Sequence, residues 1–191
     1  MANSYFLAGA FKCCISPKSE VPNLLRHMLS ESEKLCGACD KNHKIVGVGF
    51  DDNDAHIWYS GHCGNVAIRL SQLSKESQAD QVYQLAHECV HLLAPCTCYA
   101  PSVLEEGVAT VFAEDFTRTL FPSFERPQLA SFREAAHHVR ELLRENPGAI
   151  AALRSIEGVF YRMDASTFVI AGLDHVSHGL RETLLSRFVY V

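Results

Sequence analysis

The order of its strand-type and helical segments constrains the fold of this chain more than any other feature. Residues 44–50, 55–60 and 65–71 are rich in β-branched and aromatic side chains that partly alternate with small or polar ones, and turn residues lie between them. From residue 78 onward the pattern is helical nearly to the end of the chain. Strands followed by helices predict an α+β fold with a small mixed or antiparallel sheet.

We also expect an irregular start and then a helix from about Pro22 to Leu35, before the strands. The chain has 191 residues, of which 48% are hydrophobic and 20% charged, which suffices for a sizeable core. It contains no internal repeat, low-complexity segment or clear linker. The sequence therefore predicts one domain over residues 1–191, with the first helix and the strands in 1–72 and the helical part in 73–191.

Charge and hydropathy argue against several classes of partner. The formal net charge is -5 and the basic residues are scattered, so neither nucleic-acid binding nor a polybasic membrane surface is predicted. No apolar stretch approaches the roughly 18 to 20 residues that span a bilayer. The N-terminus lacks the basic region of a signal peptide. We expect a cytoplasmic protein, or one secreted by a route that needs no signal peptide.

The cysteines leave alternatives open. Without a visible signal peptide, and with enough apolar residues to fold unaided, the chain is expected to keep most of them reduced. The segments "CGAC" (36–39) and "CTC" (96–98) would also allow a four-thiolate zinc site, and Cys36 with Cys39 a redox pair. The eight positions are Cys13, Cys14, Cys36, Cys39, Cys63, Cys89, Cys96 and Cys98.

The segment "LAHECVHLLAP" carries the strongest chemical signal, on a helix that we expect over residues 78–94 and that Pro95 closes. At about 100° per residue its apolar side chains share one broad face. His87 and His91 fall on the opposite side, one turn apart, with Glu88 beside them. Two imidazoles at this spacing can bind one zinc ion, and the Glu between them can act as the general base. A helix that carries two histidines by chance is the alternative.

A catalytic zinc needs a third protein ligand. The residues after His91 lack the Gly and the His of the metzincin pattern, which excludes that class. Fourteen residues separate His91 from Glu106, which lies in "LEEGVAT". This segment resembles the "L-N-E-G-F-A-[ST]" segment of gluzincin metallopeptidases, best known from the zinc aminopeptidases. The resemblance implies that Glu106 is the third zinc ligand.

The helical geometry around Glu106 agrees with that role. Ala109, Thr110 and Ala113 share its face, and such small side chains would let this helix approach the histidine helix closely. Glu105 lies about 100° around the helix. It is expected either to support the site from behind or to face solvent. A pair of surface carboxylates that opens a helix is the alternative reading.

The resemblance, whose specific motifs cover roughly residues 82–115, implies a zincin-like fold and a zinc metallopeptidase. One zinc ion, bound by His87, His91 and Glu106, would serve a peptide or protein substrate, with Glu88 as the general base. The segment that grips a free N-terminus in the aminopeptidases is absent, which argues against aminopeptidase specificity. An endopeptidase is expected, of narrow specificity because the chain is small and has no obvious accessory domain. A binding or regulatory protein, or a secreted toxin or effector, on the same scaffold remains an alternative.

Two further expectations concern the substrate. In zincins the strand before the active-site helix lies along the edge of the cleft, and residues 65–71 take that place here. Gluzincins often add a Tyr or His that donates a hydrogen bond to the developing oxyanion. Tyr161, His175 and His178 are candidates, and none is preferred. His137 and His138 lie on an amphipathic helix and are interpreted as structural.

Overall fold

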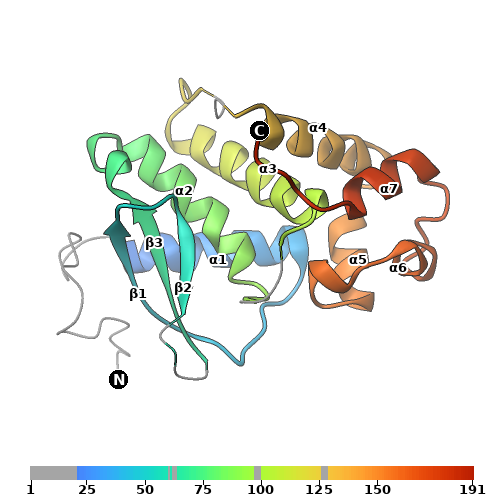
Figure 1. Ribbon diagram of the computed structural model, residues 1–191, viewed down its shortest axis with the longest axis horizontal. Helices are drawn as coiled ribbons and strands as arrows, with labels where there is room; N and C mark the ends of the chain where they lie inside the picture. Colours follow the sequence, from blue (N-terminus) through green and yellow to red (C-terminus); the bar gives the residue numbers. More distant parts are fainter. Residues whose placement is uncertain (1–20, 60, 62–63, 97–99, 126–128) are drawn as a thin grey trace.

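The structure is a computed structural model that describes residues 21–59, 61, 64–96, 100–125 and 129–191. It confirms an α+β fold in which a small sheet precedes a mainly helical part (Figure 1). In chain order the described elements are α1 (Val21–Cys36), β1 (Lys44–Asp51), β2 (His56–Tyr59), β3 (Asn65–Ser71), η1 (Gln72–Glu76), α2 (Gln78–His91), α3 (Val103–Leu120), α4 (Ala130–Glu145), α5 (Ala149–Ile156), η2 (Phe160–Arg162), α6 (Ala165–Ile170) and α7 (His178–Leu185).

The sheet is mixed and has the strand order β1-β3-β2. β1 pairs in parallel with β3, and β2 pairs with β3 in antiparallel fashion. The expectation that residues 65–71 form the edge of the cleft is therefore wrong, because β3 is the central strand. Val66, Ala67 and Ile68 point alternately to the two faces of the sheet and all are buried, so both faces are covered. The edge strand on the site's side of the sheet is β2.

The helical part is built as successive layers that position the site. α2 packs on α3, and α3 packs on α4, while α1 lies against α2 and runs behind the sheet in the view of Figure 1. The small side chains expected on the face of Glu106 are all fully buried: Ala109, Thr110 and Ala113. Their burial is consistent with the close approach of α3 to α2. Within the described residues, no helix is both long and apolar enough to cross a bilayer.

Gly107 allows α3 to lie unusually close to α4. A Cβ atom at this position would lie 2.5 Å from the backbone oxygen of Ala135 and 2.6 Å from Cγ2 of Val139. Real Cβ atoms do not approach so closely, so any larger side chain would push the two helices apart. This contact fixes the first turns of α3, where Glu105 and Glu106 lie.

The histidine helix ends earlier than the sequence indicates. We expected a helix over residues 78–94, and α2 ends at His91, with Leu92 as its C-cap. The amide of Leu93 accordingly bonds to the carbonyl of Val90 in a tight turn, where a continuing α-helix would bond it to residue 89. His91 thus lies in the last turn of α2, facing the start of the next helix.

Candidate metal centre

The site forms where the end of α2 meets the beginning of α3. Ser77 caps the start of α2, because its Oγ accepts a hydrogen bond from the amide of Asp80. At the start of α3, Ser102 Oγ accepts a hydrogen bond of 3.2 Å from the amide of Glu105. The Ser102 cap places Glu105 and Glu106 in the first turn of α3, where carboxylates interact favourably with the helix dipole.

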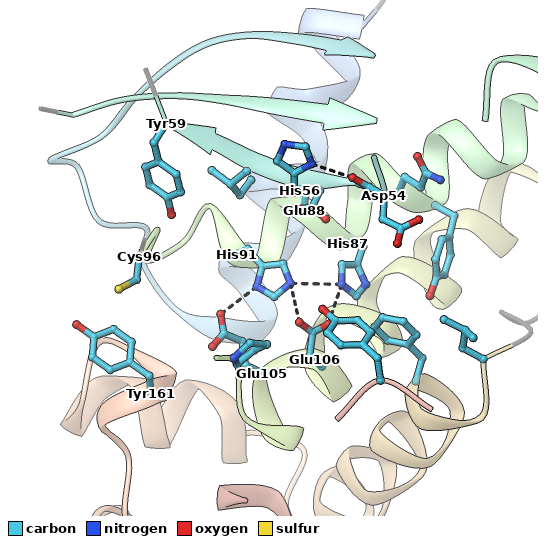
Figure 2. Close-up of a pocket in the computed structure, with 18 residues that line it drawn as sticks. Asp54, His56, Tyr59, His87, Glu88, His91, Cys96, Glu105, Glu106 and Tyr161 are labelled. Atoms are coloured by element: carbon cyan, nitrogen blue, oxygen red, sulfur yellow. Dashed lines mark hydrogen bonds and ion pairs between the residues drawn. The ribbon is translucent and has the colours of Figure 1, made fainter. Parts of the chain in front are cut away.

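Three of the four residues singled out in the sequence present their ligand atoms to one point. His87 Nε2 lies 3.1 Å from Glu106 Oε2 and 3.3 Å from His91 Nε2 (Figure 2). His91 Nε2 lies 3.7 Å from Glu106 Oε1. These three residues can hold a metal ion, as the mutual distances of their ligand atoms, all within 4.8 Å, allow.

The spacing of these donors fits zinc. Ligand atoms placed 2.0–2.1 Å from a tetrahedral zinc ion are about 3.3–3.4 Å apart. The observed separations of 3.1, 3.3 and 3.7 Å bracket that value. Two imidazoles and one carboxylate are also a donor set that zinc commonly takes when one coordination position is left for a reactant. The residues present therefore fit the ion that the resemblance implies.

His91 is oriented by Glu105. Its Nδ1 lies 2.9 Å from Oε1 of Glu105, which leaves Nε2 directed at His87 and Glu106. Glu105 is thus part of the site and not a surface carboxylate. Burial alone would lower the pKa of His91, but the carboxylates of Glu106, Glu105 and Glu88 outweigh it and raise the pKa to about 10.

His87 is oriented by packing instead. Its ring meets the edge of Phe132 at a centroid distance of 5.6 Å and lies 6.3 Å from the ring of Tyr83. Its Nδ1 is buried and has no hydrogen-bond partner among the described residues. Burial would raise the pKa of Glu106, but the two imidazoles reverse this and hold it below its ordinary value.

Glu88 is a buried carboxylate directed into the site. Only 4% of the residue is exposed, and its carboxylate forms no hydrogen bond or ion pair with any described residue. Burial raises its pKa, and this effect outweighs the opposing attraction of His91 and His87. A buried carboxylate without a partner is costly, which indicates that a polar ligand or reactant belongs beside it.

A cavity of about 550 Å³ surrounds these groups. The sheet contributes the segment from Asp54 to Tyr59, the helical part contributes side chains of α2, α3 and α4, and the C-terminal segment contributes Tyr190. Figure 2 shows Tyr59, Cys96 and Tyr161 together on one side of the two histidines, and Asp54 on the other. The lining residues are Asp54, Ala55, His56, Ile57, Tyr59, Tyr83, Gln84, His87, Glu88, His91, Cys96, Pro101, Glu105, Glu106, Leu129, Phe132, Tyr161 and Tyr190.

No family model, curated protein or solved structure matches this chain. The arrangement of its own side chains is therefore what any functional proposal must rest on.

Of the three candidate oxyanion donors, the structure brings only Tyr161 to the described wall of the cavity. His175 is exposed outside it, and His178 pairs with Glu182 on the surface of α7 at 3.2 Å. The two histidines of α4 both lie within ion-pair distance of Glu141 and do not line the cavity, consistent with a structural role.

Sequence reasoning missed Tyr190, which lies near the end of the chain. The C-terminal segment is tied down next to the site, with the amide of Phe188 bonded to the carbonyl of Pro101 at 2.9 Å. The ring of Tyr190 lies 5.8 Å from that of Phe132, which in turn contacts His87. No periodic pattern in "SRFVYV" signals this return.

Partial burial, and then the nearby carboxylates of Glu106, Glu88 and Asp54, raise the pKa of Tyr190 to about 12. Its hydroxyl therefore stays protonated at neutral pH. A protonated phenol can donate a hydrogen bond to a group held in the cavity.

Cys36 and Cys39 do not have the properties of a reactive pair. Burial raises the pKa of Cys36 to about 12 and also raises that of Cys39, the opposite of what a redox dithiol needs. Cys36, Cys39 and Cys89 are free thiols. Cys98, which a four-thiolate zinc site would require, lies outside the described residues, as do Cys13, Cys14 and Cys63.

Proposed function

We propose that this protein is a zinc-dependent metallopeptidase of the gluzincin type, with a zincin-like fold. His87, His91 and Glu106 hold the ion, and Glu88 is the general base. The observation that carries the proposal is the convergence of two imidazole nitrogens and one carboxylate beside a second, unpartnered carboxylate in a cavity. A purely structural cluster would leave neither a cavity nor a buried carboxylate without a partner.

A zinc ion held by these residues would lower the pKa of a water molecule and polarise the carbonyl of the scissile peptide bond. Glu88 removes a proton from the attacking water, while the water oxygen forms a bond to the carbonyl carbon. The same carboxyl group then gives the proton to the departing amine nitrogen as the C–N bond breaks. The raised pKa of Glu88 suits a group that must both accept and return a proton near neutral pH.

A hydroxyl in the cavity would donate a hydrogen bond to the oxygen that becomes negatively charged during attack. Tyr190 suits this role better than Tyr161. Its ring packs on Phe132, which contacts the ring of His87, whereas Tyr161 lies at the end of the cavity with Tyr59 and Cys96 (Figure 2).

The substrate would bind along β2. This strand pairs only with β3 among the described strands, and His56, Ile57 and Tyr59 line the cavity. An extended peptide can add to such an edge through backbone hydrogen bonds, and the scissile bond would then pass over the histidines. A cleft that runs along an edge strand suits an endopeptidase acting on extended peptides.

The test is hydrolysis of a peptide mixture by zinc-loaded protein, followed by mass spectrometry. We expect cleavage that a chelator abolishes and added zinc restores. Glu88→Gln should retain the zinc and lose about 10²–10⁴-fold in rate. Glu134→Gln, on the exposed side of α4, is the matched control and should cleave normally. Zinc binding without cleavage of any peptide or protein would contradict the proposal and favour a binding protein on this scaffold.

A further inference from the structure

Carboxylates outnumber the groups around the cavity that can carry a positive charge, which among the described residues are the imidazoles of His56, His87 and His91. Four carboxylates line it, those of Asp54, Glu88, Glu105 and Glu106, and no Lys or Arg does so among the described residues. These carboxylates outweigh the charge of one divalent cation. A cleft lined by one sign of charge concentrates ligands of the opposite sign.

Asp54 differs from the other three carboxylates. Glu105 and Glu106 are bonded to imidazoles, and Glu88 is buried beside them. Asp54 is exposed at the rim, and its carboxylate forms no hydrogen bond or ion pair with any described residue. Only its backbone oxygen is engaged, by His56 Nδ1 at 2.8 Å. Its charge is therefore available to a ligand.

The two ends of the cavity differ in charge. Asp54 lies on one side of the histidines, and the uncharged side chains of Tyr59, Cys96 and Tyr161 lie on the other, where the carboxylate of Glu105 is bonded to His91 (Figure 2). The field of Asp54 extends into the cavity, since it contributes to the raised pKa of Tyr190. The cavity itself and the unpartnered carboxylate of Glu88 indicate independently that a ligand is held here.

We propose that the site selects peptides that carry a basic side chain, Lys or Arg, in the part of the cavity next to Asp54, and an uncharged side chain at the end formed by Tyr59, Cys96 and Tyr161. This inference rests on the proposed function, because it takes the ligand to be a peptide. It goes further in that it assigns Asp54 as the residue that determines specificity.

Binding tests this assignment without relying on catalysis. The protein is zinc-loaded Glu88→Gln, which should hold a peptide without cleaving it. The probes are fluorescent peptides with blocked ends, of one length and one alanine-and-phenylalanine background, each with Lys, Gln or Glu at a single position. Fluorescence anisotropy gives the dissociation constants at low and at high salt.

We expect Lys to bind more tightly than Gln by about five-fold at one position, as for an exposed ion pair, and Glu to bind most weakly. High salt should reduce the difference. Adding Asp54→Asn should remove the preference, and Asp54→Lys should turn it toward Glu. Asp52→Asn, an exposed neighbour that does not line the cavity, is the control and should retain the preference.

Dissociation constants that do not depend on peptide charge, or a Lys preference that survives Asp54→Asn unchanged, would overturn the assignment, as would a failure of all the peptides to bind. Failure of the proposed function is a separate result. Wild-type protein that binds Lys peptides through Asp54 and cleaves none of them would support Asp54 as the selecting residue and contradict the peptidase.

Discussion

Glu105 accepts a hydrogen bond from Nδ1 of His91 across 2.9 Å, linking the first turn of α3 to the last turn of α2. The bond fixes the orientation of the imidazole and leaves Nε2 to face His87 and Glu106. A carboxylate behind a metal-binding histidine also increases the basicity of the ring. The residue that stands where the gluzincin pattern has Asn is therefore a positioning residue of this site.

We predict that Glu105→Ala lowers zinc affinity by about 10–100-fold, as losses of such supporting carboxylates do. Glu105→Gln should lose less, because its amide oxygen can still accept the bond from His91. Glu106→Ala removes a ligand and should weaken binding more than either variant. Competition with a chromogenic chelator measures all three affinities.

Glu182→Ala, at an exposed position of α7, is the control for that series and should bind zinc normally. Equal affinities for wild type and Glu105→Ala would show that the bond to His91 does not support the ion.

The metal-free protein should become less stable as the pH rises above neutrality. The pKa of His91 is raised from 6.5 to about 10, so its contribution is complete below pH 6.5 and is lost as the pH rises through about 10. Burial raises the pKa of Glu88, which acts in the same direction. The pKa of Glu106 is lowered from 4.5, so its contribution is present above pH 4.5 and lost in stronger acid.

Thermal unfolding in the presence of a chelator should thus give a melting temperature that falls between pH 6.5 and pH 10. Zinc binding at pH 7 should release about one proton, since a ligating imidazole must be unprotonated. Calorimetry in buffers of different ionisation enthalpy measures the release. A melting temperature that increases over this alkaline range would contradict the assignment for His91.

Gly107→Ala should destabilise the protein although alanine favours helices. The added methyl group would collide with Ala135 and Val139 of α4, and overpacking of this kind costs about 1–3 kcal/mol. Gly179→Ala in α7 is the matched control, because its Cβ would meet no atom within 4 Å. It should be neutral or stabilising by up to about 1 kcal/mol. Urea unfolding of both variants gives the comparison, and equal stability of the two would show that α3 and α4 are not in tight contact.

Tyr190→Phe should lower kcat by about 10²–10³-fold, the usual effect of removing an oxyanion donor, with little change in KM or zinc affinity. Tyr161→Phe should mainly affect KM, because Tyr161 lies at the uncharged end of the cavity. Steady-state kinetics on a cleaved peptide separate the two effects. The reverse result, in which Tyr161→Phe and not Tyr190→Phe lowers kcat, would show that Tyr161 is the oxyanion donor.

Local patterns predicted the α+β class and the residues on each helix that form the site. The two histidines share a face because helical spacing dictates it, and the cap at Ser102 sets the register of Glu106. Both facts depend on neighbours in the sequence. The structure then placed the three expected ligand residues together.

Features set by tertiary packing could not be predicted in this way. The central position of β3 depends on which strands flank it. Consecutive apolar residues such as Val66 and Ala67 are nevertheless a sequence signal for a strand that is buried on both faces, as both residues are. The bond from His91 to Glu105 and the return of Tyr190 join residues distant along the chain, for which one sequence offers no periodic signal.

The most direct test of the central claim is the zinc stoichiometry of purified protein, measured by elemental analysis after dialysis against zinc and then against a weak chelator. We predict one zinc per chain in the wild type and in Glu88→Gln, and loss of the ion in Glu106→Ala. Wild-type protein that retains no zinc, or a Glu106→Ala variant that retains as much as the wild type, would contradict a metal site formed by His87, His91 and Glu106.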